Sequence, residues 1–202
     1  MCSSVNAMDE TKEIDWNNDL VDQLDWHWQN HFRPRLDGLT DDEYFWEPVP
    51  GCWSLRPRDQ VDPAIALGSG EWALEYGWPE PTPPPVTTIA WRLGHLITGV
   101  LGARAASHFG TAPADPRSFT YSITAAGALD QLDQAYADWT KGVRGLGLDG
   151  LARPCGPAEG PYAEYPLASL VLHINRETLH HAAEITLLRD LYRAKGTGND
   201  GI

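Results

Sequence analysis

The chain has 202 residues, of which 42% are hydrophobic, and its 15 lysines and arginines are outnumbered by 28 aspartates and glutamates. This length is typical of a single domain with its own buried core. The resulting formal charge of −13 at neutral pH disfavours binding to nucleic acid or to anionic membranes, because both carry the same sign of charge.

The N-terminal sequence and the cysteines indicate in which cellular compartment the protein is found. The opening stretch, MCSSVNAMDETKEIDW, lacks the basic start and apolar run of a secretory signal. The apolar stretches elsewhere are too short to span a bilayer. Cys2, Cys52 and Cys155 are odd in number and widely spaced, so they form neither a disulfide framework nor a CxxC metal site. We therefore expect a cytoplasmic protein with reduced thiols.

The first predicted helix covers residues 15–36. Apolar side chains recur there at every fourth residue, which places them along one side of a helix. They are Leu20, Leu24, Trp28, Phe32 and Leu36. The following segment, residues 47–85, contains more than half of the chain's prolines and three tryptophans, so it predicts a long irregular loop that packs against the helices.

Three further helices are predicted after this segment. The second begins near Thr87 or Thr88 and runs to about Phe109. The third begins near Ser122 or Thr124 and ends in a glycine-rich stretch, and the fourth covers residues 167–194. Few strand signals accompany them, so the sequence predicts an all-α four-helix bundle. We expect one domain over residues 14–195, with flexible termini at 1–13 and 196–202.

The fourth helix is expected to face the bundle core with a row of apolar residues, here called the seam. Polar residues interrupt this seam. The seam positions step by four and three residues. They read Leu170, Ile174, Glu177, His181, Glu184 and Leu188. A buried carboxylate without a partner costs about several kcal/mol, so Glu177 needs a neutralising group. A metal ion bound by Glu177 and His181 would provide one, as would an ion pair with Arg92 or Arg176.

His95 in the second helix is the candidate for a third ligand. It is expected to share a helix face with Trp91, Thr98 and Gly102, and the small Gly102 would leave room beside the imidazole. Two imidazoles and one carboxylate suit zinc or a similar divalent ion and leave a coordination position open. The alternatives are a solvent-exposed glutamate and histidine pair, and a core histidine that is hydrogen-bonded to a backbone carbonyl.

Further residues are candidates to line the pocket or to orient the ligands. Glu184 either orients His181 or faces solvent. The full set of these neighbours is Trp91, Arg92, Arg176, His180 and Glu184. Cys52 has no adjacent base, so it is interpreted as a packing thiol rather than as a nucleophile.

Two stretches, TIAWRLGHL and HINRETLHHAAEITLLRDLY, give the chain a resemblance to the DinB-like superfamily of metal-binding four-helix bundles. In that family a histidine of the second helix and two residues of the fourth hold a divalent metal. The matching positions here are His95, Glu177 and His181. The glutamate departs from the plain three-histidine members and resembles the branch of mycothiol-dependent maleylpyruvate isomerase.

The resemblance implies a metal-dependent thiol transferase or isomerase that acts on a small electrophilic substrate. Its nucleophile would be the thiolate of mycothiol or of another low-molecular-weight thiol, bound to zinc, nickel, iron or manganese. The absence of a protein nucleophile with an adjacent base fits such a cosubstrate. The alternative function is a homodimeric bundle that holds a metal or a small ligand without turnover. A bundle with neither metal nor ligand is the third interpretation.

Overall fold

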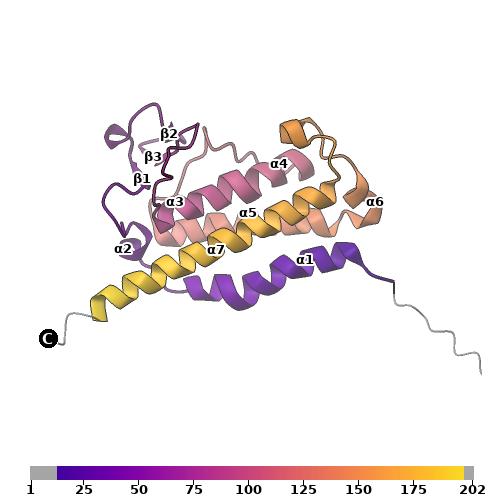
Figure 1. Cartoon of the computed structure of the whole chain (residues 1–202), viewed down its shortest axis with the longest axis horizontal. Helices are drawn as coiled ribbons and strands as arrows, with labels where there is room; N and C mark the ends of the chain where they lie inside the picture. The colour runs from indigo at the N-terminus through magenta and orange to yellow at the C-terminus, as the bar shows by residue number, and fades with distance from the viewer. Residues whose placement is uncertain (1–12, 198–202) are drawn as a thin grey trace, which may run out of the picture.

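The computed structural model describes residues 13–197, and this part of the chain is mostly helical. Figure 1 shows long helical stretches lying lengthwise, with a small sheet at one end. The expected termini, residues 1–13 and 196–202, lie almost wholly outside the described residues, and the last helix continues through Thr197. None of the helices in the described range has both the length and the apolar character that crossing a bilayer requires.

The predicted first helix is present but changes type twice. It consists of α1 (Trp16–His27), the π-helix η1 (Trp28–Phe32) and the 3₁₀-helix η2 (Arg33–Leu36). Asp15 begins it by accepting a hydrogen bond from the backbone N–H of Asn18. The wider and narrower turns after α1 keep Phe32 and Leu36 fully buried.

The second predicted helix is likewise composite. It runs through α3 (Ile89–Gly94), the π-helix η4 (His95–Gly102) and α4 (Ala103–Phe109). Thr88 caps its start by accepting from the N–H of Trp91. Gly110 ends it with a φ of 70°, in the left-handed region that glycine adopts at low cost. The π-helical stretch begins at His95.

The third and fourth predicted helices correspond to α5 (Ala125–Arg144) and α7 (Leu167–Thr197). Shorter elements that the sequence did not predict fill the connections. They are α2 (Asp41–Tyr44), η3 (Arg58–Gln60), α6 (Gly147–Ala152) and η5 (Pro157–Tyr162). In α2 the side chain of Thr40 accepts from the N–H of Glu43, and the Glu43 carboxylate accepts from the N–H of Thr40.

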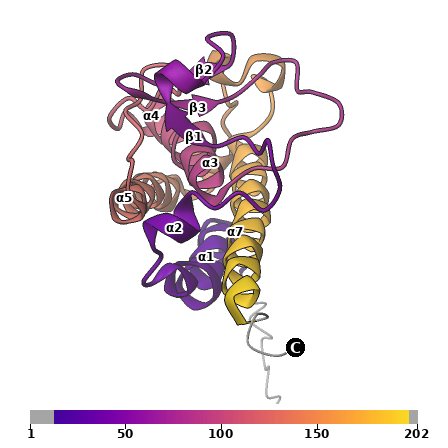
Figure 2. The same ribbon diagram turned by 90° about the vertical axis from the view of Figure 1, so that its left-hand side faces the viewer.

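The long helical stretches enclose one hydrophobic core. Figure 2, a view along the helices, shows α1, α3, α5 and α7 around a common centre. Helix α7 packs against α1 and α3, and α5 packs against α1 and η4. Fully buried side chains from all of these stretches meet there, among them Leu24, Leu93, Leu96, Leu132 and Ile174. Burial of this apolar surface is the main source of the fold's stability.

The segment 47–85 is more ordered than the irregular loop expected from its composition, and it makes the fold mostly rather than wholly helical. It carries β1 (Leu55–Pro57), β2 (Ala66–Leu67) and β3 (Trp72–Glu75), which form an antiparallel sheet in the order β1-β3-β2. Strands of two to four residues are too short for a visible alternation of apolar and polar residues. This is why the sequence did not reveal them.

The ends of this segment are fixed to the start of α3. The N–H of Trp53 donates to the carbonyl of Val86 at 2.9 Å, and the N–H of Thr88 donates to the carbonyl of Trp53 at 3.0 Å. The hydroxyls of Ser54 and Thr88 lie 2.8 Å apart. The sheet therefore lies beside α3, as Figures 1 and 2 both show.

Candidate metal centre

His95 and His181 come from different helical stretches and meet face to edge. Their ring centroids are 4.9 Å apart, and the planes are nearly perpendicular at 88°. His95 is the first residue of η4, and His181 lies in the middle of α7, which packs against η4. The structure thus brings together two imidazoles that are 86 positions apart in the sequence.

Each nitrogen of His181 faces a different carboxylate. Nδ1 lies 2.8 Å from Oε2 of Glu184, and Nε2 lies 3.9 Å from Oε2 of Glu177. When Nδ1–H donates to Glu184, a neutral imidazole presents the lone pair of Nε2 to Glu177. Two ligands of one zinc ion stand about 3–3.5 Å apart, given bonds of about 2.0–2.1 Å. A shift of a few tenths of an ångström would therefore let His181 Nε2 and Glu177 Oε2 bind one ion.

The Glu177 side chain is more exposed to solvent than its position in the apolar seam predicted. Its side chain is 30% exposed, and its Oε1 lies 3.6 Å from both His173 Nδ1 and Arg176 Nε. The expectation of a buried carboxylate is therefore wrong, whereas the alternative of an ion pair between Glu177 and Arg176 is confirmed. The seam opens into a cavity at this point, so solvent reaches the carboxylate, and its candidacy as a ligand rests on its position beside His181.

His95 is in the form that binds metals. Its ring is stacked on Trp91, with centroids 5.3 Å apart and planes inclined by 16°. Burial, together with the charges of His181, Arg92 and Arg104, lowers the pKa of His95 to about 3, so the imidazole is neutral at physiological pH. Within residues 13–197 neither ring nitrogen makes a hydrogen bond, so the backbone-bonded alternative does not describe His95.

The room beside His95 comes from Gly99 rather than from Gly102. A Cβ added at Gly99 would lie 2.8 Å from Nδ1 of His95, whereas one at Gly102 would meet the carbonyl of Ile97 and the Cβ of Ala114. The prediction for Gly102 assumed α-helical geometry. The π-helix η4 has wider turns, which change the residues that share a face with His95.

Arg92 pairs with Glu184, and not with Glu177 as one alternative held. Its guanidinium contacts the Glu184 carboxylate, and NH1 lies 3.2 Å from Nδ1 of His181. Partial burial would raise the pKa of Glu184, but the hydrogen bond from His181 and the charge of Arg92 outweigh it, so this pKa is lowered. Glu184 is therefore an ionised acceptor that fixes the orientation of His181.

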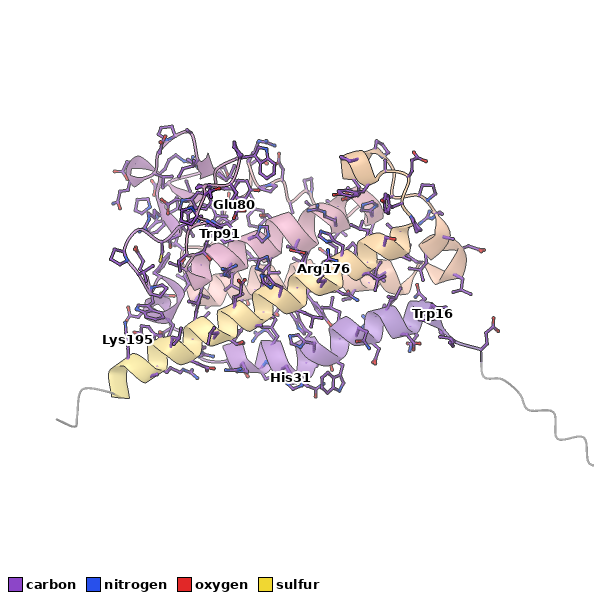
Figure 3. The ribbon with its side chains drawn as sticks, in the orientation of Figure 1. Trp16, His31, Glu80, Trp91, Arg176 and Lys195 are labelled. Atoms are coloured by element: carbon purple, nitrogen blue, oxygen red, sulfur yellow. The ribbon has the colours of Figure 1, made fainter. Side chains whose placement is uncertain are left out.

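Arg176 and His180 lie towards the outside of α7. The Arg176 side chain is 71% exposed, its NH2 lies 2.7 Å from Nδ1 of His173, and Figure 3 shows it midway along α7. His180 is 62% exposed and contacts Glu184, with 3.3 Å between Nε2 and Oε1. Trp91 lies nearer the sheet, where its Nε1–H donates to the carbonyl of Glu75 at 2.5 Å.

His180, His181 and Glu184 form a second possible donor set. They offer one ligand atom each within 4.8 Å of one another. Within residues 13–197 this is the group of three close donors that the structure provides, and His95, Glu177 and His181 do not form such a group. This set uses the Nδ1 side of His181, where Glu184 already contacts Arg92. None of the three lines the cavity that His95 and Glu177 border. A metal held by the second set would therefore lie away from the space where a substrate fits.

The cavity beside His95 and Glu177 has a volume of about 540 Å³. Part of its wall comes from the segment 47–85, through side chains of β2, β3 and the residues that follow β3. These include Leu67, Leu74, Tyr76 and Trp78. The segment that looked irregular in sequence thus contributes to the wall of the cavity that the candidate ligands border.

Several cavity residues were not expected from the sequence. Tyr121 is one of them, and its hydroxyl lies 3.2 Å from that of Thr98, which was expected on the face of His95; His173 also borders the cavity. Arg104 and Arg117 also line it. Arg104 had one visible signal, since it is a lone cation in the apolar run LITGVLGARAA. Arg117 had none, because only the tertiary fold brings its loop to the cavity.

Comparison with known proteins bears on the family. The DinB superfamily model matches residues 23–185, which include the end of α1, the sheet and all three candidate ligands. No curated protein and no solved structure matches the chain. The family match covers most of the chain and the helices that carry His95, Glu177 and His181. The chain therefore belongs to the DinB superfamily.

Proposed function

We propose that this protein is a divalent-metal-dependent thiol transferase or isomerase whose metal is held by His95, Glu177 and His181. The observation that carries the proposal is that His181 contacts both His95 and Glu177, and that His95 and Glu177 line one cavity. The helical stretches act as a four-helix bundle that keeps the two ligand-bearing segments in register. Such rigidity suits a preorganised site.

The donor set fits a divalent ion. The His95 imidazole is neutral and has no hydrogen bond within the described chain, His181 offers Nε2, and Glu177 offers a carboxylate open to the cavity. Two nitrogens and one oxygen suit zinc best, with nickel, iron and manganese as further candidates. When bound, the ion would lower the pKa of a thiol, so that thiolate is present at neutral pH.

The chain's own cysteines do not serve as the nucleophile. Burial raises the pKa of Cys52, whose Sγ donates to the carbonyl of Val49 at 2.9 Å. Burial also raises the pKa of Cys155, whose Sγ donates to the carbonyl of Pro166. Neither cysteine lines the cavity beside His95 and Glu177. The attacking thiol therefore belongs to a cosubstrate, for which mycothiol is the first candidate because of the His, Glu, His order of the ligands.

The cavity residues position the reactants. A volume of about 540 Å³ suits a small organic molecule, and its apolar wall excludes water from the carbon skeleton. Trp91 holds the His95 ring by stacking, while Arg92 and Glu184 hold that of His181. These contacts fix the ligand nitrogens before substrate arrives.

A second candidate function is a homodimer that holds a metal or a small ligand without turnover. It is favoured by large apolar side chains on the outer side of α7, where Leu172 and Leu187 are each 57% exposed. Within residues 13–197, His173 is the only histidine or carboxylate residue, apart from the candidate ligands, that lines the cavity beside His95. Such a protein would retain its ligand and show no product.

Metal content tests the proposal. Wild type should carry about one equivalent of divalent metal by plasma mass spectrometry, and His95→Ala and Glu177→Ala should carry little. His31→Ala, at an exposed histidine of η1, is the matched control and should retain the metal. Equal metal in all four proteins would overturn the ligand assignment. Loss of metal in His180→Ala but not in His95→Ala would move the metal to the second donor set.

Turnover is tested next on the metal-loaded protein. We expect mycothiol to be consumed with a panel of small electrophiles, and chelation to stop this consumption. Retention of metal without any thiol consumption would favour the non-catalytic homodimer.

A further inference from the structure

Two arginines from separate parts of the chain line the same cavity as the candidate metal ligands. Arg104 lies on α4, and Arg117 lies in the loop that precedes α5. Among the described residues, Glu177 supplies the only carboxylate in the cavity wall. In a chain of charge −13, this places a locally cationic pocket within an acidic molecule. Such a pocket attracts anionic molecules that the rest of the surface repels.

Arg104 is held in place while part of its guanidinium stays available. NH1 donates to the carbonyl of Gly99, one turn from His95. Nε lies 3.7 Å from Oε1 of Glu159, which is an ion-pair distance and too long for a hydrogen bond. Within residues 13–197 the third nitrogen, NH2, has no acceptor, and the side chain is 30% exposed. Two N–H donors in a fixed fork are suited to a carboxylate or phosphate.

Arg117 adds a cation without a partner. Its backbone N–H donates to Asp115, but its guanidinium makes no hydrogen bond and no ion pair with any described residue. A cationic side chain that borders a cavity without an acceptor is available to an incoming anion. Arg104 and Arg117 together therefore offer more donors than the wall itself uses.

The rest of the wall indicates what the anion is attached to. Leu67, Leu74 and Ile174 are apolar, and Tyr76 and Trp78 add aromatic surface. A free inorganic ion would gain nothing from these side chains, whereas a carbon skeleton would bury against them. His95 and Glu177 border the same space, so a molecule held by its anionic group at Arg104 extends towards the candidate ligands.

We propose that the cavity binds small organic molecules through an anionic oxygen group, a carboxylate or a phosphate, which pairs with Arg104 and is supported by Arg117. This proposal deepens the proposed function by naming a substrate class, and it rests on that function only for the metal side of the cavity. The pairing itself needs no metal.

Calorimetric titration at low ionic strength tests the pairing, with metal-loaded and with chelated protein. The probes are succinate, inorganic phosphate and the neutral analogue succinamide. Succinate should bind to both protein forms and succinamide to neither. The Arg104→Gln variant should weaken succinate binding about 10- to 100-fold, because one charge-assisted pair contributes about 1.5–3 kcal/mol. Arg117→Gln should weaken it less, and Arg153→Gln, at an exposed arginine outside the cavity, should not change it.

The outcomes separate this proposal from the metal assignment. Tighter binding of succinate than of phosphate identifies a carboxylate substrate, and the reverse identifies a phosphorylated one. Equal succinate affinity in Arg104→Gln and Arg153→Gln, or binding of succinamide as tight as that of succinate, would overturn the proposal. Arg104→Lys, which keeps the charge, should recover part of the affinity and shows that the loss is not one of folding. Because the titration also uses chelated protein, it measures succinate binding at Arg104 even if the metal assignment is wrong.

Discussion

Glu184 holds His181 through a contact of 2.8 Å between Oε2 and Nδ1, and this contact turns the other ring nitrogen towards Glu177. One imidazole therefore connects an ionised acceptor on one side with a candidate metal position on the other. Arg92 contacts the same Glu184 carboxylate and keeps it charged. The orientation of the ligand depends on a chain of three side chains, of which only His181 would touch the metal.

The first prediction concerns this orientation. Glu184→Gln removes the negative charge that accepts the proton of His181 Nδ1, so we expect metal affinity to fall about 10- to 100-fold. Competition with a chromogenic chelator measures it. Glu164→Gln, at an exposed glutamate outside the centre, is the control and should leave affinity unchanged. An affinity of Glu184→Gln within twofold of wild type would show that His181 is oriented by its packing alone.

The second prediction concerns Gly99. A methyl group at this position would lie 2.8 Å from Nδ1 of His95, too close for any real contact, so Gly99→Ala should displace the imidazole. We expect a loss of bound metal with a much smaller change in the melting temperature of the chelated protein. Gly145→Ala is the matched control, since its nearest contact would be an ordinary 3.5 Å. Full metal content in Gly99→Ala would indicate that His95 is not a ligand.

The third prediction concerns pH and the metal-free protein. Burial lowers the pKa of His95 from its ordinary value of 6.5 to about 3. Between these values the unfolded chain binds a proton that the folded chain does not, so the free energy of unfolding falls as pH drops from 6.5 towards 3. In His95→Gln this fall should be smaller. Urea unfolding at pH 7, 5.5 and 4 measures it, with His31→Gln as the control, and parallel curves for wild type and His95→Gln would contradict the assignment.

The fourth prediction concerns a buried ion pair away from the centre. Arg189 Nε lies 3.0 Å from Oε1 of Glu43, and both side chains are at least 96% buried. Glu43→Gln leaves a buried cation without its counter-charge and should lower the free energy of unfolding by about 3–5 kcal/mol. Asp190→Asn removes the exposed partner of Arg35 and should cost less than about 1 kcal/mol. Urea denaturation compares the two, and equal costs would contradict the burial argument.

Much of the helical architecture could be predicted from the spacing of apolar residues. The repeat from Leu20 to Leu36 gave the first helix, and Thr88 and Thr124 cap helices where caps were expected. The chain's membership of the DinB superfamily was also visible in its motifs. Such signals are local, because a helix satisfies its own backbone and shows its buried face as a period in the sequence.

The parts that could not be predicted depend on contacts between distant segments or on unusual helix geometry. Because η4 is a π-helix, Gly99 rather than Gly102 leaves the space beside His95. The spacing of apolar residues does not indicate a π-helix in advance. The accessibility of Glu177 follows from a cavity whose walls come from the sheet, η4 and α7. Arg104 and Arg117 become neighbours of that cavity only after folding. The sequence therefore indicated candidate ligands but not the space beside them.

The segment 47–85 contributes to the cavity wall but carries none of the three candidate metal ligands. The candidate ligands belong to helices, while part of the cavity wall belongs to a separate small sheet that is tied to the helices at the Trp53 and Thr88 junction. Substitutions at Leu67 of β2 would therefore change the size and shape of the cavity without touching a candidate ligand, whereas β3 also bonds Trp91, which stacks on His95. Grafting this segment between relatives would exchange part of the cavity wall and leave the helices with the candidate ligands in place.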